Sequence, residues 1–136
     1  MDMALVTRLM SKDPSTKVGA VLVRDRRIIS TGFNGFPRHI PDDQEKLNKR
    51  TLKSNRICHA EANAITGCAL HGISSYGATL YVTLHPCHEC MKLVIQSGIN
   101  RIVCPALTSQ QLVRWGDSAK LAAEFADTAG IEICQI

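Results

Sequence analysis

Apolar residues follow two different spacings along the chain, and these spacings predict both strands and helices. Five compact apolar runs are typical of buried strands, and they lie at 19–23, 28–33, 78–84, 99–104 and 131–136. Apolar or small residues at helical spacing predict four helices, at 1–10, 59–70, 87–97 and 109–129. We expect the last helix to be kinked around Trp115-Gly116-Asp117, and Gly98 and Gly130 to end the helices that precede them.

The order of these elements predicts the fold class. The turn at Asp25-Arg26-Arg27 joins the first two strands into an antiparallel hairpin. A helix connects the last two strands, so those strands should run parallel. The sequence therefore predicts an α/β protein, a three-layer α/β/α domain around a five-stranded mixed sheet. Its length of 136 residues fits a single domain, 1–136.

Two short segments carry the residues with the most specific chemistry. Residues 58–61 (Cys-His-Ala-Glu) offer an imidazole and, two positions later, a carboxylate, and residues 86–90 (Pro-Cys-His-Glu-Cys) offer two thiols at C-x-x-C spacing. Catalytic zinc sites usually have three protein ligands and keep a position for water. We therefore expect one catalytic Zn²⁺, with Glu61 beside it to transfer protons. The expected ligands are His59, Cys87 and Cys90.

Both ligand segments begin predicted helices. Pro86 lies where a helix start tolerates proline. Backbone N–H groups and the positive end of the helix dipole gather at a helix N-terminus and favour thiolates there. His85 and His88 flank the thiols, and we expect surface or supporting roles for them rather than zinc ligation.

Composition excludes several classes of protein. The net charge of +4 suits a small anionic ligand but is too low to indicate DNA binding, and an aromatic content of 4% argues against a surface that stacks the bases of long single strands. The start Met1-Asp2-Met3-Ala4 lacks signal-peptide character, and no apolar run reaches membrane-spanning length. We expect no membrane partner and a reducing cytoplasm, in which the six cysteines stay thiols.

The spacing H-x-E followed by P-C-x-x-C resembles the signature of zinc nucleobase deaminases. Segments 11–20, 32–37 and 59–65 further resemble the deoxycytidylate (dCMP) deaminases of the cytidine/deoxycytidylate deaminase superfamily. The resemblance extends from about Ser11 to about Val103. It implies the same three-layer fold and the hydrolysis of dCMP to dUMP and ammonia. This reaction would supply the precursor of dTMP in pyrimidine deoxynucleotide metabolism. Glu61 would carry a proton from water to ring N3 and then to the leaving amino group.

The resemblance also implies contacts with the substrate. Asn34 occupies a position that contacts the sugar in related deaminases, although Asn-Gly pairs also favour tight turns. The backbone N–H of Ala60 is placed to receive the 2-oxo group of the base. A loop that borders the substrate in the family is a candidate for holding the 5′-phosphate, or is merely a capped turn with solvated lysines; its residues are Lys12, Ser15, Thr16 and Lys17.

Two further regions leave their roles open. The polar, irregular stretch 36–56 is either a basic lid over a nucleotide, an effector-binding segment or a solvated loop. The tail departs from many dCMP deaminases, which carry tyrosines after the fourth strand. Here Trp115 either replaces an aromatic wall of the pocket or belongs to the core, and Arg114 is a candidate for phosphate.

Relatives are commonly homo-oligomers, and many are activated by dCTP and inhibited by dTTP. We therefore expect a hexamer or dimer that binds a deoxycytidine nucleotide and no nucleic acid, in the cytoplasm or, for a viral protein, the host cytoplasm. Alternatives remain open: a dCTP or bifunctional dCMP/dCTP deaminase, a deaminase of tRNA adenosine or single-stranded DNA, and a structural zinc module that binds a partner and catalyses nothing.

Overall fold

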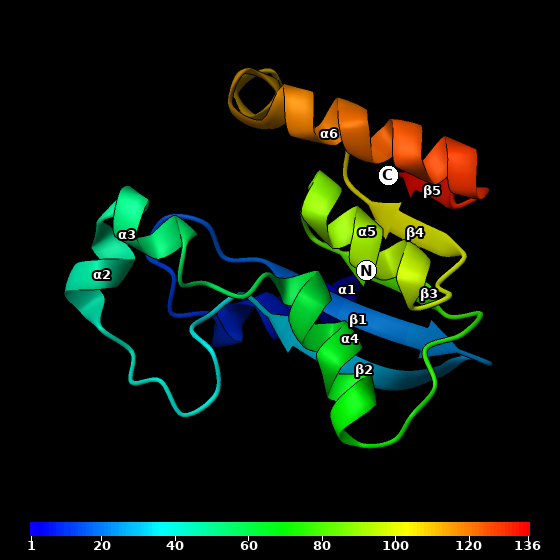
Figure 1. The fold of residues 1–136 in the computed structure, drawn as a ribbon, viewed down its shortest axis with the longest axis horizontal. Coiled ribbons are helices and arrows are strands. Elements are labelled where there is room, and N and C mark those ends of the chain that lie inside the picture. The colour runs from blue at the N-terminus through cyan, green and yellow to red at the C-terminus, as the bar shows by residue number, and fades with distance from the viewer.

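A five-stranded sheet in the order β2-β1-β3-β4-β5 runs through the computed structural model, which describes all residues from 1 to 136 (Figure 1). Strand β1 pairs antiparallel with β2 and with β3, whereas β3, β4 and β5 run parallel. The predicted hairpin, mixed sheet and parallel last pair are therefore confirmed. The strands are β1 (Gly19–Arg24), β2 (Arg27–Phe33), β3 (Thr79–Val82), β4 (Arg101–Cys104) and β5 (Glu132–Gln135).

Helices cover both faces of this sheet and make the predicted three layers. The parallel strand pairs are joined by helical crossovers, and the helices of these crossovers lie on one face of the sheet (Figure 1). Helix α1 (Asp2–Thr7), continued by a 3-10 helix at Arg8–Met10, lies behind β1 on the other face (Figure 1). The helices of the first face are α4 (Ala60–Leu70), α5 (His88–Gln96) and α6 (Ser109–Ala129).

The main hydrophobic core lies between the sheet and helices α4, α5 and α6. Its fully buried members include Leu22, Leu80, Val82, Met91, Val94 and Ile102. On the other face, Ala4 is the only buried residue of α1. The sequence predicts a helix over 1–10 that covers the sheet with its apolar side chains, but in the structure the large ones stay exposed: Met3, Leu5, Val6, Leu9 and Met10.

The polar stretch 36–56 is irregular as predicted only in its first part, because residues 44–54 form two short helices. These are α2 (Gln44–Asn48) and α3 (Arg50–Ser54). The Asp43 side chain caps α2 by accepting a hydrogen bond from the Lys46 N–H, and Leu47 is buried. We call residues 36–57 the lid segment. Its ends are held together because the residues that flank it, Gly35 and Cys58, exchange two backbone hydrogen bonds of 3.1 and 2.8 Å.

Helix α6 runs without interruption from Ser109 to Ala129, so Gly116 does not end it. Its first turns point in a different direction from the rest of the helix (Figure 1), in line with the predicted kink around 115–117. Glycine inside a helix costs only about 1 kcal/mol, and strong end signals outweigh it here. Thr108 and Gln111 form a capping box at the start, and Gly130 ends the helix with a φ of 71°. Neither α6 nor any shorter helix combines the length and apolar character that crossing a bilayer requires.

Gly32 controls how closely α4 approaches the sheet. A Cβ at this position would lie 2.2 Å from the Ala60 carbonyl oxygen and 2.4 Å from the Ala64 backbone nitrogen. We expect Gly32→Ala to lower the free energy of unfolding by about 3 kcal/mol or more, because the start of α4 must move. The matched control is Gly116→Ala in α6, where an added Cβ meets no atom within 4 Å. Urea unfolding should show this control at least as stable as the parent, and equal stabilities of the two variants would contradict the packing.

Candidate active site

The start of α4 and the start of α5 bring the three predicted metal ligands together. His59 and Cys87 are the N-cap residues of these helices, each with extended backbone, and Cys90 lies in the first turn of α5. His59 Nδ1 lies 3.5 Å from Cys87 Sγ and 3.3 Å from Cys90 Sγ, and all three donor atoms fall within 4.8 Å of one another. Tetrahedral zinc with bonds of about 2.0 Å to nitrogen and 2.3 Å to sulfur separates such donors by about 3.6 Å. The donor types and their separations therefore fit zinc.

The metal-free ligands interact strongly with one another. A hydrogen bond with Cys90 lowers the pKa of the Cys87 thiol to about 4, and the same pairing raises the pKa of Cys90. The hydrogen bond with Cys87 raises the pKa of His59. One thiolate is thus stabilised by proton donors that a bound cation would replace.

Glu61 lies in the first turn of α4, beside this cluster, and its side chain is buried. Only 4% of the residue is exposed. Burial raises the pKa of its carboxyl group from 4.5 to about 7. A carboxyl group whose pKa lies near neutrality both accepts and donates a proton at little cost, which is what general acid and base catalysis requires.

The buried carboxyl group of Glu61 predicts a pH-dependent stability of the metal-free protein. Its pKa is higher in the folded chain than the 4.5 of an exposed glutamate, so the unfolded chain loses this proton first as pH rises. The contribution of this group to stability therefore falls between about pH 4.5 and about pH 7, by about 3 kcal/mol in total. We expect Glu61→Gln to stabilise the chelator-treated protein at pH 8 and to do so far less at pH 5. Thermal unfolding of both proteins at both pH values measures this, and a difference independent of pH would contradict it.

A cavity of about 240 Å³ opens beside the cluster. Its lining comes from distant parts of the chain: the loop after α1, the end of β2, the lid segment, the two ligand segments and the first half of α6. Polar lining residues outside the cluster include Asp13, Thr16, Asn34, Arg50, Lys53, Ser54, Arg114 and Ser118. The arrangement provides three metal ligands and an acid at one place and cationic side chains elsewhere in the same cavity, which suits an anionic organic molecule.

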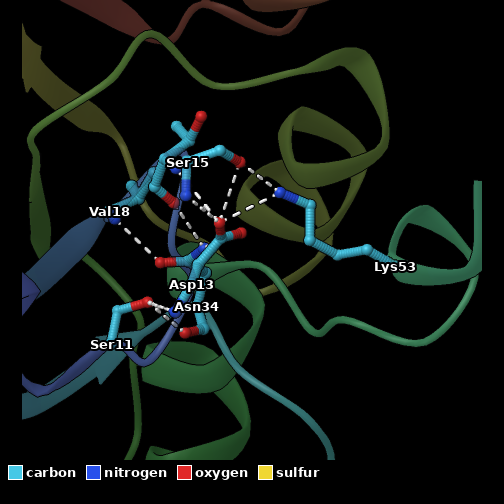
Figure 2. Close-up of polar contacts among 7 residues, drawn as sticks. Ser11, Asp13, Ser15, Val18, Asn34 and Lys53 are labelled. Atoms are coloured by element: carbon cyan, nitrogen blue, oxygen red, sulfur yellow. Dashed lines mark hydrogen bonds and ion pairs between the residues drawn. The ribbon is translucent and has the colours of Figure 1, made fainter. Parts of the chain in front are cut away.

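A buried polar network shapes one wall of this cavity (Figure 2). The Asn34 side chain accepts a hydrogen bond from the Val18 N–H (2.8 Å) and donates to the Thr16 carbonyl (2.9 Å) and to Asp13 Oδ2 (3.3 Å). Ser11 Oγ donates to the Asn34 carbonyl oxygen at 2.8 Å. Both N–H groups of the Asn34 amide are therefore used within the protein. A hydroxyl of a ligand would have to donate to Asn34 Oδ1, which keeps a lone pair.

The structure brings three of the predicted substrate contacts to the cavity and leaves three outside its lining. Thr16, Asn34 and Ala60 line it. Lys12 instead forms an exposed ion pair with Asp42 at 2.6 Å. Ser15 accepts a hydrogen bond from Lys53, and Lys17 is exposed and does not line the cavity.

Other predicted residues also have clear places. His88 Nδ1 lies 2.8 Å from Ser118 Oγ on α6, and His85 Nδ1 lies 3.0 Å from the Pro86 carbonyl oxygen, so neither joins the metal cluster. Trp115 lines the cavity, and the Arg114 guanidinium lies 4.7 Å from the centre of its ring. All six cysteines are free thiols: Cys58, Cys68, Cys87, Cys90, Cys104 and Cys134.

Sequence reasoning assigned no role to Asp13. Its carboxylate is buried, with 2% of the residue exposed, and it accepts hydrogen bonds from the N–H groups of Ser15 and Thr16. The local pattern Asp13-Pro14-Ser15-Thr16 is typical of a turn in which an aspartate accepts such bonds. The sequence therefore indicated the turn, but the partner that Asp13 meets from the lid segment lies 40 positions away.

Comparisons with known proteins identify similar sequences and folds. Residues 1–106 match the family model described as the cytidine and deoxycytidylate deaminase zinc-binding region. An uncharacterized deaminase in the luxG 3′ region of Aliivibrio fischeri is 38% identical over 131 residues, which cover 96% of this chain and 86% of that protein. The human deoxycytidylate deaminase is 38% identical over 109 residues, which cover 76% of this chain and 60% of the human protein, so the chain spans about three fifths of that relative.

Among solved structures, the dCMP deaminase of the cyanophage S-TIM5 in complex with dCMP and dUMP is similar with a TM-score of 0.78. Its sequence is 22% identical, and the match covers 99% of this chain and 92% of the phage chain. This similarity shows a shared fold. The family is shown by the match to the family model and by the sequence identity to the relatives. The chain therefore belongs to the cytidine and deoxycytidylate deaminase family.

Proposed function

We propose that the chain, loaded with zinc, hydrolyses dCMP to dUMP and ammonia. The observation that carries this proposal is the three-ligand cluster with the buried Glu61 beside it, at the wall of a cavity that cationic side chains also line. Relatives named deoxycytidylate deaminase and a similar phage structure that contains dCMP and dUMP support this substrate.

The residues of this chain supply positioning and proton transfer. His59, Cys87 and Cys90 hold zinc, which when bound lowers the pKa of water toward neutrality. Glu61 accepts a proton from the attacking water and donates it to ring N3, while the C4–O bond forms. Glu61 then carries the second water proton to the amino group, the C4–N bond breaks, and ammonia leaves. The Ala60 N–H, at the start of α4, holds the 2-oxo group so that C4 faces Glu61.

The proposal extends to assembly and regulation. Five large apolar side chains on α1 and the 3-10 helix are exposed, and a homo-oligomer would cover them: Met3, Leu5, Val6, Leu9 and Met10. Control by dCTP and dTTP follows from the family resemblance, as does a place in nucleotide supply. All six cysteines are unpaired, and a reducing compartment keeps such thiols reduced, which supports the cytoplasm or the cytoplasm of a viral host.

Ultraviolet-monitored deamination of a substrate panel tests the proposal. The panel contains dCMP, dCTP, cytidine and tRNA, each with the zinc-loaded protein and with and without added dCTP as effector. We expect dCMP to have the highest kcat/KM. Faster turnover of dCTP would assign the triphosphate instead, and inosine in tRNA would assign a polynucleotide substrate. A zinc-loaded protein inactive on every substrate would favour a structural zinc module.

A further inference from the structure

A buried ion pair fastens the lid segment to the loop after α1. Lys53 Nζ on α3 lies 3.0 Å from Asp13 Oδ1, and the two side chains are only 12% and 3% exposed (Figure 2). Lys53 also donates to Ser15 Oγ. Asp13 Oδ1 also accepts from the N–H groups of Ser15 and Thr16, and Asp13 Oδ2 accepts from the Asn34 amide. A buried carboxylate with this many donors is fixed in place, so it fixes the ammonium group that it holds.

The other polar ties of the lid segment are weaker. Lys12 and Asp42 form an ion pair whose side chains are 64% and 35% exposed. Exposed ion pairs contribute little, whereas removing one partner of a buried pair leaves an uncompensated charge. The Lys53–Asp13 pair is therefore the polar contact on which the position of α3 depends most.

The position of α3 determines where Arg50 lies. Arg50 is the first residue of α3, three positions before Lys53, and both residues line the cavity. Arg114 lines the same cavity from α6 and stacks on Trp115. Neither Arg50 nor Arg114 takes part in an ion pair within the chain, whereas the charge of Lys53 is balanced by Asp13. Two arginines without an ion-pair partner thus line one cavity.

Two guanidinium groups match the charge of a phosphate monoester, which is about −1.5 to −2 at pH 7. The reacting base must lie at the metal cluster and Glu61, so the phosphate of a nucleotide must be bound by lining residues elsewhere in the cavity. We propose that Asp13 and Lys53 are positioning residues whose ion pair docks the lid segment and so places Arg50. Arg50 and Arg114 together then bind the phosphate of the substrate. This inference rests on the proposed function, because it assumes a nucleotide substrate.

The proposal predicts which kinetic constant changes. The phosphate takes no part in the bond changes at C4, so its contacts are equally strong in the ground state and in the transition state. Loss of such contacts raises KM and leaves kcat unchanged. A purely structural defect would instead lower the amount of active enzyme, and therefore kcat, at constant KM.

The experiment compares Lys53→Met with Lys49→Met in the zinc-loaded protein, using dCMP. Lys49 lies four positions earlier in the same segment, outside the cavity lining, in an exposed ion pair with Glu45. We expect Lys53→Met to raise KM at least about tenfold with kcat within about threefold of the parent, and Lys49→Met to match the parent. Lys53→Arg, which keeps the charge, should restore most of the lost affinity.

Asp13→Asn provides the second arm of the test. It should raise KM as Lys53→Met does, and the double variant should be no worse than the more impaired single variant, because both changes break one contact. If Asp13→Asn fails to fold, Lys53→Met alone decides, because Lys53 lines the cavity and its side chain is less buried than that of Asp13. An unchanged KM in Lys53→Met, or a loss confined to kcat, would overturn the positioning role. A parent protein that does not deaminate dCMP would instead overturn the proposed function, so the two failures are distinguishable.

Discussion

Glu61→Gln should lose nearly all turnover of dCMP while keeping its zinc. Glutamine fills the same space but cannot accept a proton from water or deliver one to the base. Positioned acid and base groups contribute about 10²- to 10⁴-fold to rate, and we expect kcat to fall by that amount or more because Glu61 acts twice. Steady-state kinetics and zinc content measured on the same sample check both halves of this prediction.

The matched control is Glu89→Gln on the neighbouring helix α5. Glu89 is exposed and pairs with Lys92, and it lies outside the cavity lining. Its variant should retain the kcat of the parent. Near-parental activity of Glu61→Gln would refute the proton-transfer role. Loss of zinc from this variant would mean that Glu61 contributes to zinc binding.

Cys87→Ser should lose both metal and activity. A serine hydroxyl is a poor zinc ligand at neutral pH, and two remaining donors, His59 and Cys90, do not make a stable site. The Cys87 thiol also accepts a hydrogen bond from the Cys90 N–H at 3.5 Å, so its loss weakens the start of α5 as well. We expect bound zinc to fall from about one per chain to near zero, as measured by atomic emission, with kcat falling to background.

Cys134→Ser in β5 is the control for removing a thiol. Cys134 is half-buried and is not part of the metal cluster. It should keep zinc and activity. Full zinc occupancy in Cys87→Ser would contradict the ligand set.

The sequence was sufficient where the signal is local. The alternation of apolar runs with helical spacing predicted five strands and the helices between them, and topology rules then gave the parallel last pair. The H-x-E and C-x-x-C spacings lie at helix starts, so they predicted three donors that the structure places within 4.8 Å. Short spacings of this kind leave the backbone few alternatives.

The sequence was insufficient where partners are distant or signals conflict. Gly116 weakens the middle of α6, but the caps at Thr108 and Gly130 favour one continuous helix. Helices α2 and α3 are each five residues long, too short for an apolar spacing to reveal them. The Asp13–Lys53 pair joins residues 40 positions apart, and only the folded chain shows that this aspartate is buried.

The most direct test of the account is product analysis with one zinc ion per chain, before and after removal of the metal by a chelator. The zinc-loaded protein should convert dCMP to equal amounts of dUMP and ammonia, the chelated protein should convert none, and added zinc should restore conversion. A fully zinc-loaded protein that leaves dCMP unchanged, or a chelated protein that remains active, would contradict the account.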